Sequence, residues 1–191
     1  MSNVYANSPS GGKWEEKFKE WFKVDLRDDP RIIWRNEAYG LLLRFDDKPV
    51  TEGHVLAVPW EAAQMVDDLA DPRSDKLGRV ARAAGRHLAA VLSAEGRPPR
   101  YVGQLVAGGQ VWHAHVHRAP CFVGPDWLEG FSGQNPRLDP TDEEWEHTIH
   151  RFGDTFDGAA LDAELTAMGP AEDLKAMEQY ALDLRDRRLA R

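Results

Sequence analysis

The chain contains one cysteine, Cys121, among its 191 residues. A single cysteine cannot form an internal disulfide, which excludes the disulfide-stapled class of small secreted domains. No apolar run reaches the roughly 18 residues that a membrane-spanning helix needs, so we expect no membrane partner. Basic residues do not cluster with aromatic ones, and the formal net charge is −8. Because a long phosphate backbone attracts positive surfaces, we also expect no nucleic-acid partner.

The chain does have enough apolar residues for one core, since 42% of them are hydrophobic. Its length suits one compact domain with appendages. Residues 1–12 are polar and lack the apolar segment of a secretory signal, so we expect a cytoplasmic protein. We predict a polar tail and amphipathic helix over 1–30, a core over 31–120, and a C-terminal extension of the same domain over 121–191.

Three of the seven histidines alternate along one short stretch, at His113, His115 and His117. In an extended strand alternate side chains share a face, so these imidazoles lie together while Ala114 and Val116 pack on the other face. An imidazole titrates near neutral pH and also binds metals. The row therefore offers a nucleophile, a proton carrier and an orienting partner, or alternatively a set of metal ligands.

Strand patterns surround one long helical pattern. They cover 32–34, 39–45, 54–59 and 101–106, and the histidine strand follows after a Gly-Gly turn. We predict a core helix that begins after Ser74 as a possible cap and ends near Gly96. Its apolar stripe consists of Leu77, Val80, Ala81, Ala84, Leu88, Val91 and Leu92. The fold class is α+β, with an antiparallel sheet of about five strands and one main helix.

Further helices are expected at both ends of the chain. Aromatic residues at helical spacing predict an amphipathic helix over 13–24. Thr141 to Glu144 form a capping-box pattern, which opens a helix through Phe152, and a last helix starts near Pro170. His147 and His150 lie on one face of the former, where solvated or packed histidines are favoured over a metal pair.

The histidine row and the stretch 48–59 together resemble the histidine triad superfamily. That superfamily has a His-φ-His-φ-His-φ-φ pattern preceded by a Gly-Gln pair, matched here by Gly109-Gln110 and the row from His113. The upstream stretch is similar in its proline turn, its Gly53-His54 pair and its apolar strand ending at Pro59. The resemblance covers about 31–120 and implies a nucleotide-binding fold, commonly a homodimer.

The resemblance also implies roles for the histidines. His115, the middle one, would attack the α-phosphorus of a nucleotide and form a covalent nucleotidyl-histidine that water or another acceptor resolves. His113 would hold the tautomer of His115, and His117 would contact phosphate oxygens. His54 would lie behind the row. No metal or cofactor is needed for this chemistry.

Contacts to the nucleoside follow from the same resemblance. Asp46 holds the family position of an acidic residue that binds the ribose hydroxyls, although aspartate is also an ordinary turn residue. Three apolar residues, Ile33, Leu43 and Phe45, are candidates for contacts to the base, but only one strand face can line the pocket. Two glutamines, Gln104 and Gln110, complete the set of candidate nucleotide contacts.

The approach to the row departs from the family pattern. Only Val111 and Trp112 separate Gln110 from His113, and the usual Ser or Thr is absent. One missing residue changes strand parity, so Gln110 reaches the histidine face only through a bulge or an altered turn. Arg118 replaces an apolar residue and either meets solvent or contacts phosphate.

Two other functions remain open. The histidines could hold zinc in a hydrolase with an open water position. Alternatively, the nucleotide pocket serves a binding protein or a recruited biosynthetic step without hydrolytic turnover.

Overall fold

A computed structural model describes residues 31–43, 51–60, 63, 65–107, 114–122 and 142–169 of this chain. Five strands, one short 3-10 helix and three α-helices lie in this part. In chain order they are β1 (Ile32–Arg35), β2 (Tyr39–Leu43), β3 (Val55–Pro59), η2 (Val66–Asp68), α2 (Asp71–Ala94), β4 (Tyr101–Ala107), β5 (His115–Cys121), α4 (Asp142–Gly153) and α5 (Gly158–Ala167).

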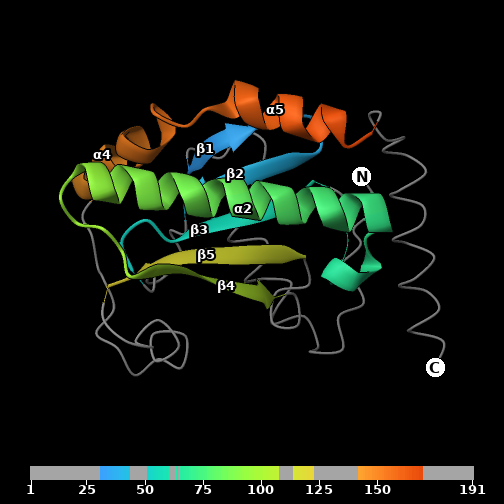
Figure 1. Cartoon of the computed structure of the whole chain (residues 1–191), viewed down its shortest axis with the longest axis horizontal. Helices are drawn as coiled ribbons and strands as arrows, with labels where there is room; N and C mark the ends of the chain where they lie inside the picture. Colours follow the sequence, from blue (N-terminus) through green and yellow to red (C-terminus); the bar gives the residue numbers. More distant parts are fainter. Residues whose placement is uncertain are drawn as a thin grey trace.

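The strands form one antiparallel sheet in the order β1-β2-β3-β5-β4 (Figure 1). The predicted α+β class and five-stranded sheet are therefore confirmed. The histidine strand β5 lies between β3 and β4, so both its edges are hydrogen-bonded. A central position holds the backbone of a site strand more firmly than an edge would.

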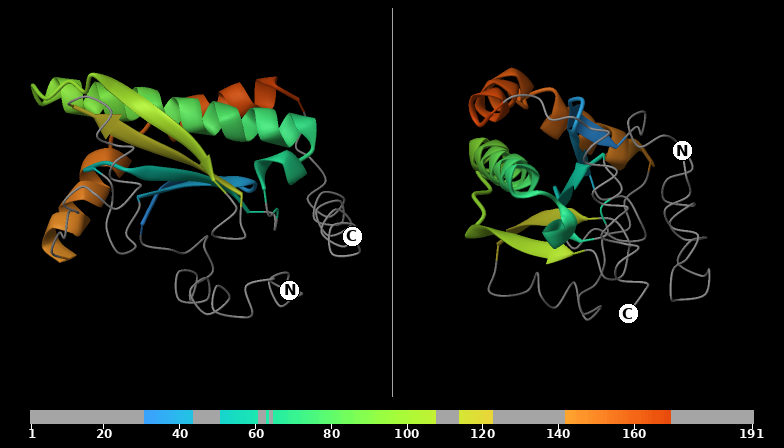
Figure 2. Two further views of the ribbon diagram at one scale, coloured as in Figure 1. Left: turned by 90° about the horizontal axis from the view of Figure 1, so that it is seen from below. Right: turned by 90° about the vertical axis from the view of Figure 1, so that its right-hand side faces the viewer.

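Helix α2 packs on one face of the sheet, and α5 lies on the same side beside α2 (Figure 2). The predicted stripe faces the sheet: Leu77, Val80, Ala81, Leu88 and Leu92 are fully buried. The predicted start at Ser74 is wrong, because the helix begins at Asp71 with Pro72 in its first turn. Proline suits that position, since its missing N–H has no partner in the helix there.

Helix α4 confirms the element predicted from the capping box, and it packs against β1. Helix α5 was not predicted. Asp157 caps it, with its side chain accepting a hydrogen bond from the Ala160 N–H, and Leu161 and Leu165 are buried. The helices expected over 13–24 and from Pro170 lie outside the described residues. No helix in the described part of the chain is long and apolar enough to cross a membrane.

A charge cluster ties α4 to the turn before β3. Arg151 of α4 forms ion pairs with Glu52 and with Glu95, and Arg97 donates to Glu52 at 2.8 Å. Burial by itself would raise the pKa of Glu52. The hydrogen bonds and charges of Arg97 and Arg151 outweigh burial and hold that pKa below its ordinary value of 4.5.

Because its pKa is lowered in the folded state, Glu52 contributes to the free energy of unfolding by an amount that depends on pH. The contribution of Glu52 is fully present above pH 4.5 and is lost as the pH falls through the lowered folded-state pKa. In urea unfolding between pH 3 and 7, Glu52→Gln should be less stable than the parent by about 0.5–1 kcal/mol at pH 7. That difference should shrink toward pH 3.

The control is Glu143→Gln, which changes an exposed residue of α4. It should follow the parent at every pH. If the free energy of unfolding of Glu52→Gln differed from that of the parent by the same amount at pH 3 and at pH 7, the account would be contradicted.

Candidate functional site

The alternation of β5 divides the histidines from the core. Ala114 and Val116 belong to the hydrophobic core, whereas His115 and His117 point to the opposite face of the sheet. Both histidines are 7% exposed. Their ring centroids lie 4.6 Å apart, and the ring planes are inclined to each other by 63°. The predicted division between a chemical face and a core face is therefore present over residues 114–117.

His54 completes a cluster of three buried imidazoles. It immediately precedes β3, and Leu56 two residues later pairs with His117, so His54 lies on the same face as the β5 histidines. Its Nε2 lies 2.9 Å from Nδ1 of His117, and the ring centroids are 5.1 Å apart. The structure thus places His54 directly behind His117, in contact with it.

This hydrogen bond restricts the protonation states of the pair. One of the two nitrogens must donate and the other must accept, so the two rings cannot both be doubly protonated. Because Nδ1 of His117 is used for His54, Nε2 is the nitrogen of His117 that can meet a substrate. His54 can therefore select the tautomer of His117.

Apolar side chains on the histidine face come from positions that the sequence did not single out. Leu42 pairs with Leu56, and Gly40 pairs with Val58, so these four positions share the face of His117. The indole of Trp60 lies against Gly40, where an added Cβ would overlap the ring. The sequence alone could not identify these four positions, because their shared face follows from the pairing of residues between neighbouring strands.

Three predicted contact residues lie elsewhere. Leu43 is in the core under α2, and Ile33 packs against that core beside Gly153 of α4. Gln104 pairs with Arg118 on the helix side of the sheet and accepts a hydrogen bond from it at 2.7 Å. The structure does not bring these three side chains to the histidine face.

Arg118 does not lie on the histidine face, where one of its two expected environments, a phosphate contact, would require it. Its guanidinium lies against Gly85 of α2, on the face opposite His117, and is half-buried. Burial lowers its pKa. The predicted phosphate contact by Arg118 is therefore wrong. The alternation of β5 continues through this residue and places its side chain on the face opposite the histidines.

Four further candidates, His113, Asp46, Phe45 and Gln110, lie outside the described residues. His147 and His150 are exposed on α4, and His150 pairs with Asp154 at 3.5 Å. Among the described residues, no group of three His, Cys, Asp or Glu side chains is arranged to hold a metal ion.

Comparison with known families gives one match that covers the sheet and its helix. Residues 30–122 match the model of the HIT domain. The matched segment spans β1 to β5 and includes His54, His115 and His117. A comparison with curated protein sequences gives no match.

Solved structures with the same fold share little sequence identity with this chain. A hypothetical histidine triad nucleotide-binding protein from Sulfolobus tokodaii is 19% identical, with TM-score 0.55, over 74% of this chain and 91% of that one. A Hit-like protein involved in cell-cycle regulation from Bartonella henselae is 14% identical, with TM-score 0.50, over 78% and 95%. The C. elegans NitFhit protein is 20% identical, with TM-score 0.49, over 65% of this chain; the chain spans 27% of that protein's length.

Proposed function

Because the chain belongs to the histidine triad superfamily, we propose that it is a nucleotidyl hydrolase or transferase. In this proposal it acts at the α-phosphate of a nucleoside monophosphate derivative, and a phosphoramidate is the leading substrate. The observation that carries the proposal is the buried cluster of His54, His115 and His117 on one face of the sheet. Its test is the detection of a nucleotidyl adduct on the protein.

The reaction proceeds in two displacements. A ring nitrogen of His115 attacks the α-phosphorus, the bond from phosphorus to the leaving group breaks, and the leaving group departs with a proton. Water or a second acceptor then attacks the nucleotidyl-histidine, which releases the nucleotide and restores neutral His115. An imidazole suits this sequence because it is a competent nucleophile near pH 7.

His117 and His54 stabilise the charge that develops on the phosphate oxygens. A donor to those oxygens must carry a proton on Nε2 of His117, so its Nδ1 accepts from Nε2–H of His54. This assigns one tautomer to each ring. We also assign His113 the role of orienting His115, as the family resemblance implies.

The nucleoside end of the substrate lies toward β2 in this proposal. Asp46 would accept from the ribose hydroxyls. Phe45 and Gln110 remain candidates for contacts to the nucleotide. For apolar contacts to the base we replace Leu43 by Leu42, whose register with Leu56 puts it on the histidine face.

We further propose that the protein works as a homodimer in the cytoplasm. Support for a dimer comes from the family resemblance and from the edge strand β4, where Val106 is 52% exposed. The single buried cysteine, Cys121, suits a reducing compartment.

A zinc hydrolase is the main competing function, favoured by the contacts that His117 makes with both His54 and His115. The contact between His54 and His117 argues against a zinc site, because the two facing nitrogens serve a hydrogen bond.

We expect chelation with 1,10-phenanthroline to leave hydrolysis of an adenosine phosphoramidate unchanged, and the purified protein to hold well under one zinc per chain. Loss of activity with chelator and its return with zinc would establish the zinc mechanism instead.

A binding or recruited biosynthetic role is the second alternative. It is favoured by the shortened stretch between Gln110 and His113, which lacks the family's Ser or Thr. Tight nucleotide binding without adduct or product would support it.

A further inference from the structure

We propose that Arg151 of α4 is a positioning residue, which acts on His54 through Glu52. By fixing the turn that carries His54, it sets the tautomer of His117. The catalytic part of this inference rests on the proposed function, since it assumes that His117 donates to the phosphate. Helix α4 lies outside the segment 30–122 that matches the HIT domain. A helix beyond the family domain therefore controls the geometry of the histidine cluster.

The turn before β3 places His54. The His54 N–H donates to the Thr51 carbonyl at 3.2 Å, and Gly53 has φ +75°, as the third residue of a type II turn requires. His54 lies one residue before β3, so its backbone N–H closes this turn rather than a pair of strands. The orientation of its ring therefore depends on the geometry of the turn.

Two arginines hold the second residue of the turn, Glu52. It forms an ion pair with Arg151 and accepts a hydrogen bond from Arg97 at 2.8 Å. The side chain of Arg151 is 14% exposed and also pairs with Glu95, whereas the side chain of Arg97 is 51% exposed. Because solvent screens an exposed ion pair, Arg151 contributes more than Arg97 to holding the turn.

The end of α4 contacts the same turn at a second point. The ring of Phe152 lies against Gly53, where an added Cβ would be 2.8 Å from Cζ of the ring. The Phe152 carbonyl accepts a hydrogen bond from Nε2 of His87 on α2 at 2.7 Å, and the Phe152 side chain is fully buried. Arg151 therefore reaches Glu52 from a helix end that is itself anchored to α2. Such an anchored neighbour can hold a side chain of a site in one orientation.

The last step of the path is the contact between two buried imidazoles. Nε2 of His54 lies 2.9 Å from Nδ1 of His117, and the ring centroids are 5.1 Å apart. A shift of the donor ring by about 1 Å breaks this hydrogen bond, because its strength falls steeply with distance and angle. His117 then exchanges between two neutral tautomers, and only one of them carries the Nε2–H that donates to phosphate.

Arg151→Met tests the proposal in the full chain, because it removes the charge and keeps a long side chain. With an adenosine phosphoramidate we expect kcat to fall by about 10- to 100-fold and KM to change by less than about twofold. Misorientation of the cluster affects the reaction step more than it affects binding. Arg151→Lys keeps the charge but not the forked guanidinium, so its kcat should lie between those of the parent and of Arg151→Met.

Nitrogen-15 NMR of the histidine rings, recorded without substrate, locates the protons directly. In the parent we expect Nε2 of His117 to carry the proton and Nδ1 to be unprotonated. Arg151→Met should give a mixture of the two neutral tautomers of His117. A parent that hydrolyses no phosphoramidate would refute the proposed function alone, because the spectrum needs no turnover and still tests the role of Arg151.

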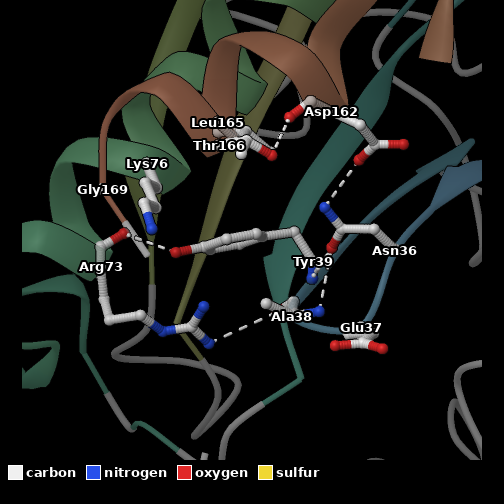
Figure 3. Close-up of a pocket in the computed structure, with 10 residues that line it drawn as sticks. All are labelled: Asn36, Glu37, Ala38, Tyr39, Arg73, Lys76, Asp162, Leu165, Thr166 and Gly169. Atoms are coloured by element: carbon white, nitrogen blue, oxygen red, sulfur yellow. Dashed lines mark hydrogen bonds between the residues drawn. The ribbon is translucent and has the colours of Figure 1, made fainter. Parts of the chain in front are cut away.

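A hydrogen bond between another helix and another turn supplies the matched control. Asp162 of α5 accepts at 2.9 Å from the side chain of Asn36, in the turn between β1 and β2 (Figure 3). Asp162→Ala breaks this hydrogen bond and leaves the turn of His54 unchanged. Its kcat and its His117 spectrum should therefore match those of the parent. Thermal melts check that every variant is folded at the temperature of the assay.

Three results would overturn the proposal. In the first, Arg151→Met keeps the kcat of the parent while the parent is active. In the second, the tautomer of His117 is the same in Arg151→Met as in the parent. In the third, Asp162→Ala gives the same losses as Arg151→Met, which would show that Arg151 stabilises the fold without positioning His54.

Discussion

Replacement of His115 by alanine is expected to lower kcat/KM for an adenosine phosphoramidate by roughly three to six orders of magnitude. The variant loses the nucleophile, and water in its place lacks the two-step route through a covalent intermediate. Binding of adenosine monophosphate should change by less than about fivefold, because the contacts to ribose, base and phosphate remain. Steady-state kinetics and a binding isotherm measure the two quantities separately.

His150→Ala is the matched control for this experiment. It removes an exposed imidazole on α4, away from the cluster, and should keep the activity of the parent. Equal turnover by His115→Ala and the parent would refute the role of His115. A thermal melt of the variant shows whether its fold is intact, since His115 is buried in the sheet.

Gly53→Ala is expected to destabilise the protein by about 2–4 kcal/mol and to lower activity as well. Gly53 has φ +75°, and a Cβ at this position would lie 2.8 Å from Cζ of Phe152 and 3.3 Å from Cδ2 of Leu88. Both the backbone and the side-chain space therefore require glycine. The next residue is His54, so a shift of this turn also moves the ring that contacts His117.

A double variant separates the two causes of this loss. Gly53→Ala combined with Phe152→Leu relieves the steric overlap but keeps the backbone strain, so its total destabilisation should be smaller than the sum of the two single changes. Urea unfolding of the four proteins measures that difference. If the double variant lost as much stability as the two single variants together, or more, the Phe152 ring would not limit the space for a side chain at position 53.

The sequence predicted those features of the site that depend on local periodicity. Alternation along β5 was sufficient to separate His115 and His117 from Ala114 and Val116, because a strand has a period of two. The apolar stripe of α2 was likewise readable from helical spacing, which fixes the face that the sheet covers.

Features of the site that depend on how the strands pair could not be predicted from the sequence. Leu43 and Leu42 are adjacent and equally apolar, and only the register with β3 decides that Leu42 shares the histidine face. A register shift between Ile32 and Trp34 similarly affects the side on which β1 residues lie. Gln104 is placed by its partner Arg118 across β4 and β5, which no local pattern reveals.

Helix α5 was missed for a different reason. It has only 10 residues, and two of them, Leu161 and Leu165, are buried. Its N-cap Asp157 is followed by Gly158, a residue typical of turns. With so short an apolar stripe, periodicity gave no clear helical signal.

The most direct measurement is the intact mass of the parent and of His115→Ala after rapid acid-free quenching of a reaction with an adenosine phosphoramidate. Dinucleoside polyphosphates and nucleotide sugars are tested in parallel. We predict a nucleotidyl adduct on the parent, lost on acid treatment and absent from His115→Ala. Hydrolysis of these substrates without an adduct, or an adduct of equal yield on His115→Ala, would contradict the account.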